Sequence, residues 1–274
     1  MQRLVALAAV AAVASVLAMT LSSAANAGHK IRIPLASAFS GPYVDFGERL
    51  FNQGAMPAVR EINAAGGING HTLEFYKMDV RFPDTVAFLS DLRLECSKKD
   101  VPMIFGIGST KTTIASLEIL KKCKIPAFNP TSGGAWPFPD FGGWLFRYLP
   151  TPEKTLPVMF RKALPAFGVK TAAISHTNDD DFAVNNIKIV RKALADDGVK
   201  IVSDQSIKTK ETNFQSQVAA ARRGNPDAVV LIHQPGDAGT MLRQLRDRGV
   251  KSQVFTDIIM VGAPVRPTCS PLIA

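Results

Sequence analysis

The sequence is poor in cysteine and histidine, and the few that it has are unfavourably spaced for binding a metal. Only three cysteines and four histidines occur among its 274 residues. No C-x-x-C pair is present, and the histidines share no helical metal-ligand spacing. We therefore expect no metal site.

Long apolar runs are also scarce, and the single long one lies at the very start of the chain. Residues 1–3 carry one arginine, residues 4–21 are apolar and rich in alanine, and Ala25-Asn26-Ala27 forms an A-x-A pattern. This order predicts a secretory signal cleaved after Ala27. A membrane anchor is the alternative, but the alanines make the segment weakly hydrophobic and the small-residue site follows at once. No later segment approaches ~18 uninterrupted apolar residues, so we expect a soluble, periplasmic mature protein.

The chain is basic, but its basic residues form no nucleic-acid-binding stripe. The net charge is +9 for the whole chain and +8 without residues 1–27, which contain one arginine. Pairs such as Lys121-Lys122 and Arg222-Arg223 lie near the ends of predicted helices, where the helix dipole favours positive charge. No basic stripe alternates with aromatic residues, so we expect no nucleic-acid partner.

Two of the three cysteines lie at comparable positions in neighbouring predicted helices. Cys96 and Cys123 both lie near the ends of predicted helices that flank a strand at 103–107, so they would share one edge of a sheet. In an oxidising compartment they would form a disulfide if their Cα atoms lie close enough, and two buried thiols are the alternative. The sequence leaves both outcomes open.

Predicted strands and helices alternate along the chain with short connections between them. This alternation is typical of right-handed βαβ crossovers and predicts an α/β fold with mostly parallel sheets. A Gly/Pro/aromatic connection at 130–143 interrupts the rhythm, so we expect an N-terminal lobe over 28–150 and a C-terminal lobe over 151–257. Pro57 removes a backbone donor within the first helix, which predicts a kink or a register fault there. The expected strands cover 31–36, 72–78, 102–107, 126–129, 171–176, 200–206, 228–233 and 253–256, and the expected helices cover 47–65, 84–98, 112–122, 152–167, 182–197, 213–223 and 236–248.

Two short turns that carry hydroxyl groups directly follow predicted strands. Ser109 and Thr110 come after the strand that ends near residue 105, and Thr131 and Ser132 come after the next strand. In an open parallel sheet such turns line the crevice at the carboxyl ends of the strands, where backbone N–H groups and hydroxyls hold small polar ligands. Each hydroxyl taken alone is equally well explained as a helix cap or a turn residue.

Three motifs in the first lobe resemble one family. Residues 31–42 read IRIPLASAFSGP, residues 46–47 read FG, and residues 61–70 read EINAAGGING. In this order they are similar to the start of the Leu/Ile/Val-binding protein family, the type I periplasmic solute-binding proteins of ABC importers, and the similarity extends over about 30–256. The resemblance implies two Rossmann-like lobes joined by three crossovers, which close over a ligand in the cleft between them without changing it chemically. It also implies an ABC permease in the membrane as partner and an amino acid, amide or carboxylate as ligand.

The resemblance also assigns ligand-binding residues. Phe182 stands where many relatives have tyrosine, so a hydroxyl is lost there, and ordinary core packing is the other reading of Phe46 and Phe182. The resemblance also implies an acidic partner for a ligand ammonium group near the strand after the Arg248-Gly249 turn, but the match to the family pattern fails there, and Asp257 is only nearby. Both departures weigh against an α-amino acid as ligand. The residues implied to bind ligand are Phe46, Ser109, Thr110, Thr131, Ser132, Phe182 and Gln234.

Other functions of the same residues are less well supported. Gly106-x-Gly108 lacks the third glycine and the acidic ribose partner of a dinucleotide site, and Lys111-Thr112 is one residue too close to Gly106 for a P-loop. We therefore expect no cofactor and no enzymatic activity. The acidic run at 179–181 is explained by helix-dipole stabilisation as readily as by a metal. A ligand-binding sensor or regulator with the same fold remains the main alternative.

The end of the sequence departs from the alternating pattern. Residues 258–274 contain three prolines and show neither a strand nor a helix period. The resemblance leads us to expect further strand–helix units here. The chain is therefore expected to be truncated at its C-terminus and to be at best a weak, easily unfolded binder.

Overall fold

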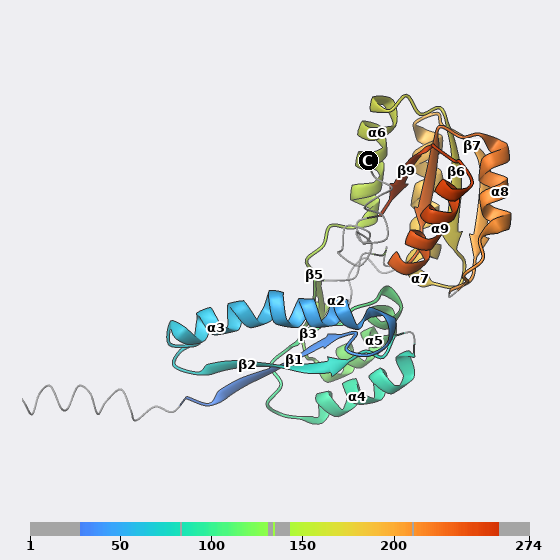
Figure 1. Cartoon of the computed structure of the whole chain (residues 1–274). Coiled ribbons are helices and arrows are strands. Elements are labelled where there is room, and N and C mark those ends of the chain that lie inside the picture. The colour runs from blue at the N-terminus through green and yellow to red at the C-terminus, as the bar shows by residue number, and fades with distance from the viewer. Residues whose placement is uncertain (1–27, 83, 131–133, 135–142, 210, 258–274) are drawn as a thin grey trace, which may run out of the picture.

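Two parallel β-sheets, each flanked by helices, make up the described part of the molecule (Figure 1). The computed structural model describes residues 28–82, 84–130, 134, 143–209 and 211–257. The first sheet has the strand order β2-β1-β3-β4-β5 and the second has the order β7-β6-β8-β9, with every ladder parallel. The predicted α/β class is confirmed. No helix within these ranges combines the length and the apolar character needed to cross a membrane.

The first sheet is covered on both faces. Helices α4 and α5 bury Phe88, Leu92 and Leu120 against one face, and α3 packs Val59 against Ile33 on the other. The strands are β1 (Lys30–Ser37), β2 (Thr72–Asp79), β3 (Ile104–Gly106), β4 (Ala127–Asn129) and β5 (Leu145–Arg147), and the helical segments are η1 (Gly41–Tyr43), α2 (Val44–Arg49), η2 (Leu50–Ala55), α3 (Met56–Ala64), α4 (Thr85–Ser97) and α5 (Thr110–Cys123).

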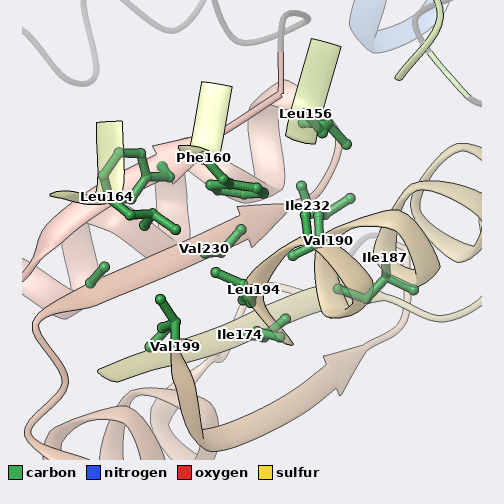
Figure 2. Packing of buried hydrophobic residues seen from close by; sticks show 14 of the residues in the cluster. Leu156, Phe160, Leu164, Ile174, Ile187, Val190, Leu194, Val199, Val230 and Ile232 are labelled. Atoms are coloured by element: carbon green, nitrogen blue, oxygen red, sulfur yellow. The ribbon is translucent and has the colours of Figure 1, made fainter. Parts of the chain in front are cut away.

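The second sheet has the more continuous core. Leu156, Phe160 and Leu164 repeat along α6 and pack against Val190 of α7 and Val230 of β8, as Figure 2 shows. Helices α8 and α9 cover the opposite face. The strands are β6 (Thr171–Thr177), β7 (Lys200–Ile207), β8 (Ala228–Ile232) and β9 (Gln253–Thr256), and the helices are α6 (Pro152–Ala166), α7 (Asp181–Asp196), α8 (Gln215–Gly224) and α9 (Pro235–Asp247).

The helix expected over 47–65 is a continuous helical run in three segments, and Pro57 explains its irregularity. Residues 50–55 form a π-helix, in which the N–H of Met56 donates to the carbonyl of Phe51. Proline has no N–H to offer the turn that precedes it, so a widened turn relieves the clash of its ring with the backbone. The predicted register fault is confirmed, and the run starts at Val44, earlier than expected.

Strand β5 corrects the prediction for the connection between the lobes. No strand was expected between residues 129 and 152, but Leu145–Arg147 pairs with β4, with Phe146 opposite Phe128. Three residues are too few to show a strand period. The strand exists because the edge of β4 supplies hydrogen-bonding partners, which a local pattern does not reveal.

Cys96 and Cys123 form a disulfide between the ends of α4 and α5, with their Cα atoms 5.5 Å apart. The sequence had left a pair of free thiols equally open. The bridge joins the two helices that cover the same face of the first sheet, and both cysteines pack against its core cluster.

Replacing both cysteines by serine is expected to lower the free energy of unfolding of the first α/β unit by about 3 kcal/mol, because the 27-residue separation makes the unfolded chain less constrained once the bridge is lost. Urea unfolding in the presence and absence of a thiol reductant measures this. Reductant should destabilise the native protein by a similar amount and leave the double variant unchanged. An equal effect of reductant on both proteins would contradict the prediction.

Candidate functional site

The turn after β3 presents the start of α5 at the carboxyl end of the first sheet. Ser109 is the N-cap of α5: its Oγ accepts a hydrogen bond from the N–H of Thr112 at 3.0 Å, and its carbonyl accepts from the N–H of Thr113 at 2.9 Å. The cap explains why α5 begins at Thr110, two residues before the predicted start. The partial positive charge of the helix N-terminus is therefore directed at this edge.

Thr110 and Asn129 hold this turn in place. Thr110 is only 4% exposed, and its hydroxyl packs so closely on Gly134 that a side chain at 134 would overlap it. The side-chain amide of the fully buried Asn129 donates at 2.8 Å both to the carbonyl of Ile107 and to the hydroxyl of Thr113. Asn129 thus fastens β4 to the turn, a role that the sequence did not predict. Thr131 and Ser132 lie outside the described residues.

A buried histidine and two hydroxyl groups form a row of hydrogen bonds near the carboxyl end of the second sheet. His233, which is 1% exposed, lies between two hydroxyls: its Nδ1 is 3.0 Å from Thr177 Oγ1 and its Nε2 is 3.0 Å from Ser175 Oγ. Burial, reinforced by the neighbouring His176, lowers the pKa of His233 to about 3. The imidazole is therefore neutral and links the ends of β6 and β8. Sequence reasoning missed it, because a lone histidine carries no spacing signal.

Gln234 and Asp180 are joined directly after these strands. Gln234 Nε2 donates to Asp180 Oδ2 at 2.6 Å, and Asp180 Oδ1 accepts from the N–H of Phe182 at 3.2 Å, which caps α7. Asp180 is 5% exposed, and burial raises its pKa.

The three consecutive aspartates have separate structural roles. Asp179 accepts from the N–H and the hydroxyl of Thr209, both at 2.8 Å, while Asp181 is exposed in the first turn of α7. No group of three or more potential metal ligands occurs among the described residues. Asp180 caps α7 and Asp181 interacts favourably with the dipole of this helix, whereas Asp179 holds Thr209.

Tyr43, just before α2, reaches from the first unit towards the second. Burial raises the pKa of the Tyr43 hydroxyl, and the negative charges of Asp237 and Asp180 add to the effect. Helices α5 and α7 are also in contact, so the two units approach each other at these helices (Figure 1). Tyr43 was not singled out from the sequence, and Phe46, which was, lies on α2 and is 38% exposed.

Two other residues singled out from the sequence are engaged within the second unit. Phe182 is 2% exposed and its ring belongs to the core cluster that contains Phe160, which matches the alternative reading of core packing. Asp257 is 3% exposed and accepts a hydrogen bond from Asn186 at 2.8 Å. The positive charge of Arg147, at the end of β5, lies within electrostatic reach of Asp257.

Comparison with known proteins gives consistent matches along the chain. A family model described as periplasmic binding protein matches residues 30–265. An amino acid binding protein of Pseudomonas aeruginosa is 25% identical over 246 residues, which cover 88% of this chain and 65% of that protein. The Leu/Ile/Val-binding protein of Escherichia coli K12 is 24% identical over 225 residues, which cover 81% of this chain and 60% of that protein. The chain thus spans less than two thirds of the length of these curated relatives.

Solved structures with the same fold include proteins with different bound ligands. LivJ from Streptococcus pneumoniae in complex with isoleucine superposes with a TM-score of 0.72 at 22% identity, covering 83% of this chain and 64% of that one. A solute-binding protein from R. palustris in complex with 4-hydroxybenzoate superposes with a TM-score of 0.75 at 19% identity, covering 87% and 64%. At these identities the similarity shows the fold alone.

Proposed function

The chain belongs to the periplasmic binding protein family, and on that premise we propose that it captures a small polar solute between its two α/β units for an ABC importer. The family consists of solute-binding proteins, and its description implies a location outside the cytoplasm. We place the protein in the periplasm after cleavage behind Ala27, with a membrane permease as its partner. The observation that carries the proposal is that α5, whose start is capped by Ser109, contacts α7 of the other unit, whose N-cap Asp180 binds Gln234.

The start of α5 supports the binding of an anionic group. Ser109 already satisfies the N–H of Thr112, so an anion would draw on the backbone N–H of Lys111 and on the helix dipole. Thr131 and Ser132 follow the neighbouring strand and would add polar partners. Isoleucine and 4-hydroxybenzoate, each bound by a structural relative, share a carboxylate. We therefore propose a carboxylate-bearing amino acid, amide or small acid as the ligand.

The remaining contacts of the proposed site come from both units. Phe46 would cover the ligand from the first unit, and Gln234 would contact it from the second. Phe182 would act indirectly, since its amide anchors Asp180 while its ring fills the core beneath. Two units that bind one ligand between them are expected to close over it by a hinge motion.

A differential scanning fluorimetry screen tests the proposal. Amino acids, short amides and small carboxylates are added over a concentration series, and the correct ligand should raise the melting temperature progressively, since it binds only the folded state. Sodium chloride at equal ionic strength controls for non-specific effects. A folded sample whose melting curve is unchanged by every compound would refute the proposed function.

Ser109→Ala is expected to weaken ligand binding by roughly fivefold and to lower stability by about 1 kcal/mol, because the cap that orients the first turn of α5 is lost. Asp84→Ala is the matched control: Asp84 caps α4 through the N–H of Val86 at 3.0 Å, after the edge strand β2. Isothermal titration calorimetry and thermal unfolding are compared for both variants. Equal affinity of both variants would show that the cap of α5 serves only the fold.

A further inference from the structure

Asp180 holds the side chain of Gln234 in one orientation. The two residues follow β6 and β8, which are neighbours in the second sheet, and each stands at the N-cap position of the next helix. The contact is short, 2.6 Å from Gln234 Nε2 to Asp180 Oδ2, and the carboxylate is almost completely buried. A buried charged hydrogen bond of this kind fixes a flexible side chain more firmly than a contact between neutral groups.

The chemistry of a carboxylate decides which end of the amide points away. An ionised carboxylate only accepts hydrogen bonds, so Gln234 must turn its NH₂ group towards Asp180. The second oxygen of Asp180 is occupied by the N–H of Phe182. The carbonyl oxygen of Gln234, Oε1, accepts no hydrogen bond from the described residues, and the residue is partly exposed.

We propose that Asp180 is a positioning residue that makes Gln234 present a hydrogen-bond acceptor to the bound solute, so that the solute carries an N–H or O–H donor at this end. The inference rests on the proposed function and narrows its ligand class. A solute that fits both ends of the site has a carboxylate for the start of α5 and an amide, ammonium or hydroxyl group for Gln234. The charge around this end of the site is negative and favours a donor group on the solute, because the carboxylates of Asp180 and Asp237 both lie within electrostatic reach of Tyr43.

Helix capping alone does not account for Asp180. Capping uses Oδ1, whereas Oδ2 is committed to Gln234, 54 residues away in the sequence. The adjacent aspartates provide matched controls, since Asp179 binds Thr209 and Asp181 is exposed.

Asp180→Asn tests the orientation directly. Asparagine still caps a helix through its oxygen, but it then turns an NH₂ group towards Gln234. The amide of Gln234 must rotate so that Oε1 faces Asn and its own NH₂ faces the solute. In the variant Gln234 therefore presents a hydrogen-bond donor to the solute instead of an acceptor. The protein should then prefer solutes that accept a hydrogen bond over solutes that donate one, which reverses the preference of the native protein.

Pairs of solutes that differ only in a neutral group measure this preference. Glutamine is compared with glutamate γ-methyl ester, and 4-carbamoylbenzoate with monomethyl terephthalate, since a primary amide donates and a methyl ester only accepts. We expect the native protein to favour the amide of at least one pair by about tenfold. Asp180→Asn should remove or reverse that ratio, while Asp179→Asn and Asp181→Asn should keep it. Because both members are neutral at the variable end, loss of the Asp180 charge alone does not reverse the ratio.

The outcomes separate this inference from the proposed function. Solute binding with the same ratio in the native protein and in Asp180→Asn supports the proposed function and overturns the role of Asp180. If neither these solutes nor the wider panel binds the native protein, the proposed function fails. Nuclear magnetic resonance of the ligand-free protein then decides the orientation of the Gln234 side chain. The signals of its NH₂ group are identified by their absence in Gln234→Leu. Their hydrogens should exchange slowly with solvent in the native protein and in Asp179→Asn, and faster in Asp180→Asn. Equal exchange rates in all three proteins would overturn it.

Discussion

Acidification from pH 6.5 to pH 3.5 is expected to lower the free energy of unfolding of the second α/β unit by about 4 kcal/mol through His233. In the folded state burial lowers the pKa of His233 from 6.5 to about 3. The unfolded chain therefore takes up a proton in this range that the folded protein does not. The stabilisation is complete above pH 6.5 and is lost at ~1.4 kcal/mol per pH unit as the pH falls.

Hydrogen exchange at the amides of β6 and β8, corrected for the intrinsic exchange rate at each pH, reports the stability of this unit. His233→Gln removes the titrating group while keeping a donor and an acceptor for Thr177 and Ser175, so its acid limb should be flatter than that of the native protein. His29→Gln, at an exposed position before β1, is the matched control and should follow the native curve. Parallel acid limbs for the native protein and His233→Gln would show that His233 does not resist protonation.

Most of the fold was predictable because its periodicities are local. The helix expected over 152–167 is present as α6, and Phe160 and Leu164, four residues apart on it, share its buried face. Pro57 predicted the fault in the first helix because a missing N–H affects its own turn. β5 was not predictable, since three residues become a strand only when a neighbouring edge is present.

In the candidate site, too, local features were predictable from the sequence and contacts between distant residues were not. Ser109 was found because a hydroxyl between a strand and a helix is a local signal, although the same signal fits a cap, and the side chain does cap α5. The contact of Asp180 with Gln234 and that of Thr177 with His233 join residues 54 and 56 positions apart. Such pairs follow from the order of β6 and β8 in the sheet, which sequence pattern alone does not give. The disulfide likewise required the distance between two helix ends.

Gly106 connects the packing of the first sheet to the geometry of the proposed binding turn. It ends β3 with a φ of +110°, and a Cβ at this position would overlap the carbonyl oxygen of Ala36 on β1. That same carbonyl accepts a hydrogen bond from the N–H of Ile107 at 2.7 Å. The close approach of two backbones therefore sets the path of the chain from β3 to Ser109.

Gly106→Ala is accordingly expected to lower the free energy of unfolding of the first unit by about 4 kcal/mol or more, because a strained φ and a backbone overlap add together. Gly66→Ala separates the two costs: its φ is +99° but no atom lies within 4 Å of the added Cβ, so it should cost only ~1 kcal/mol. Urea unfolding of both variants, with calorimetric titration of any solute found in the screen, measures stability and binding together. Alanine at 106 can be accommodated only if β1 and β3 move apart, which shifts the start of α5 and should abolish binding, whereas Gly66→Ala should bind normally. Similar stabilities for the two variants would show that the contact with Ala36 does not determine the path of the turn.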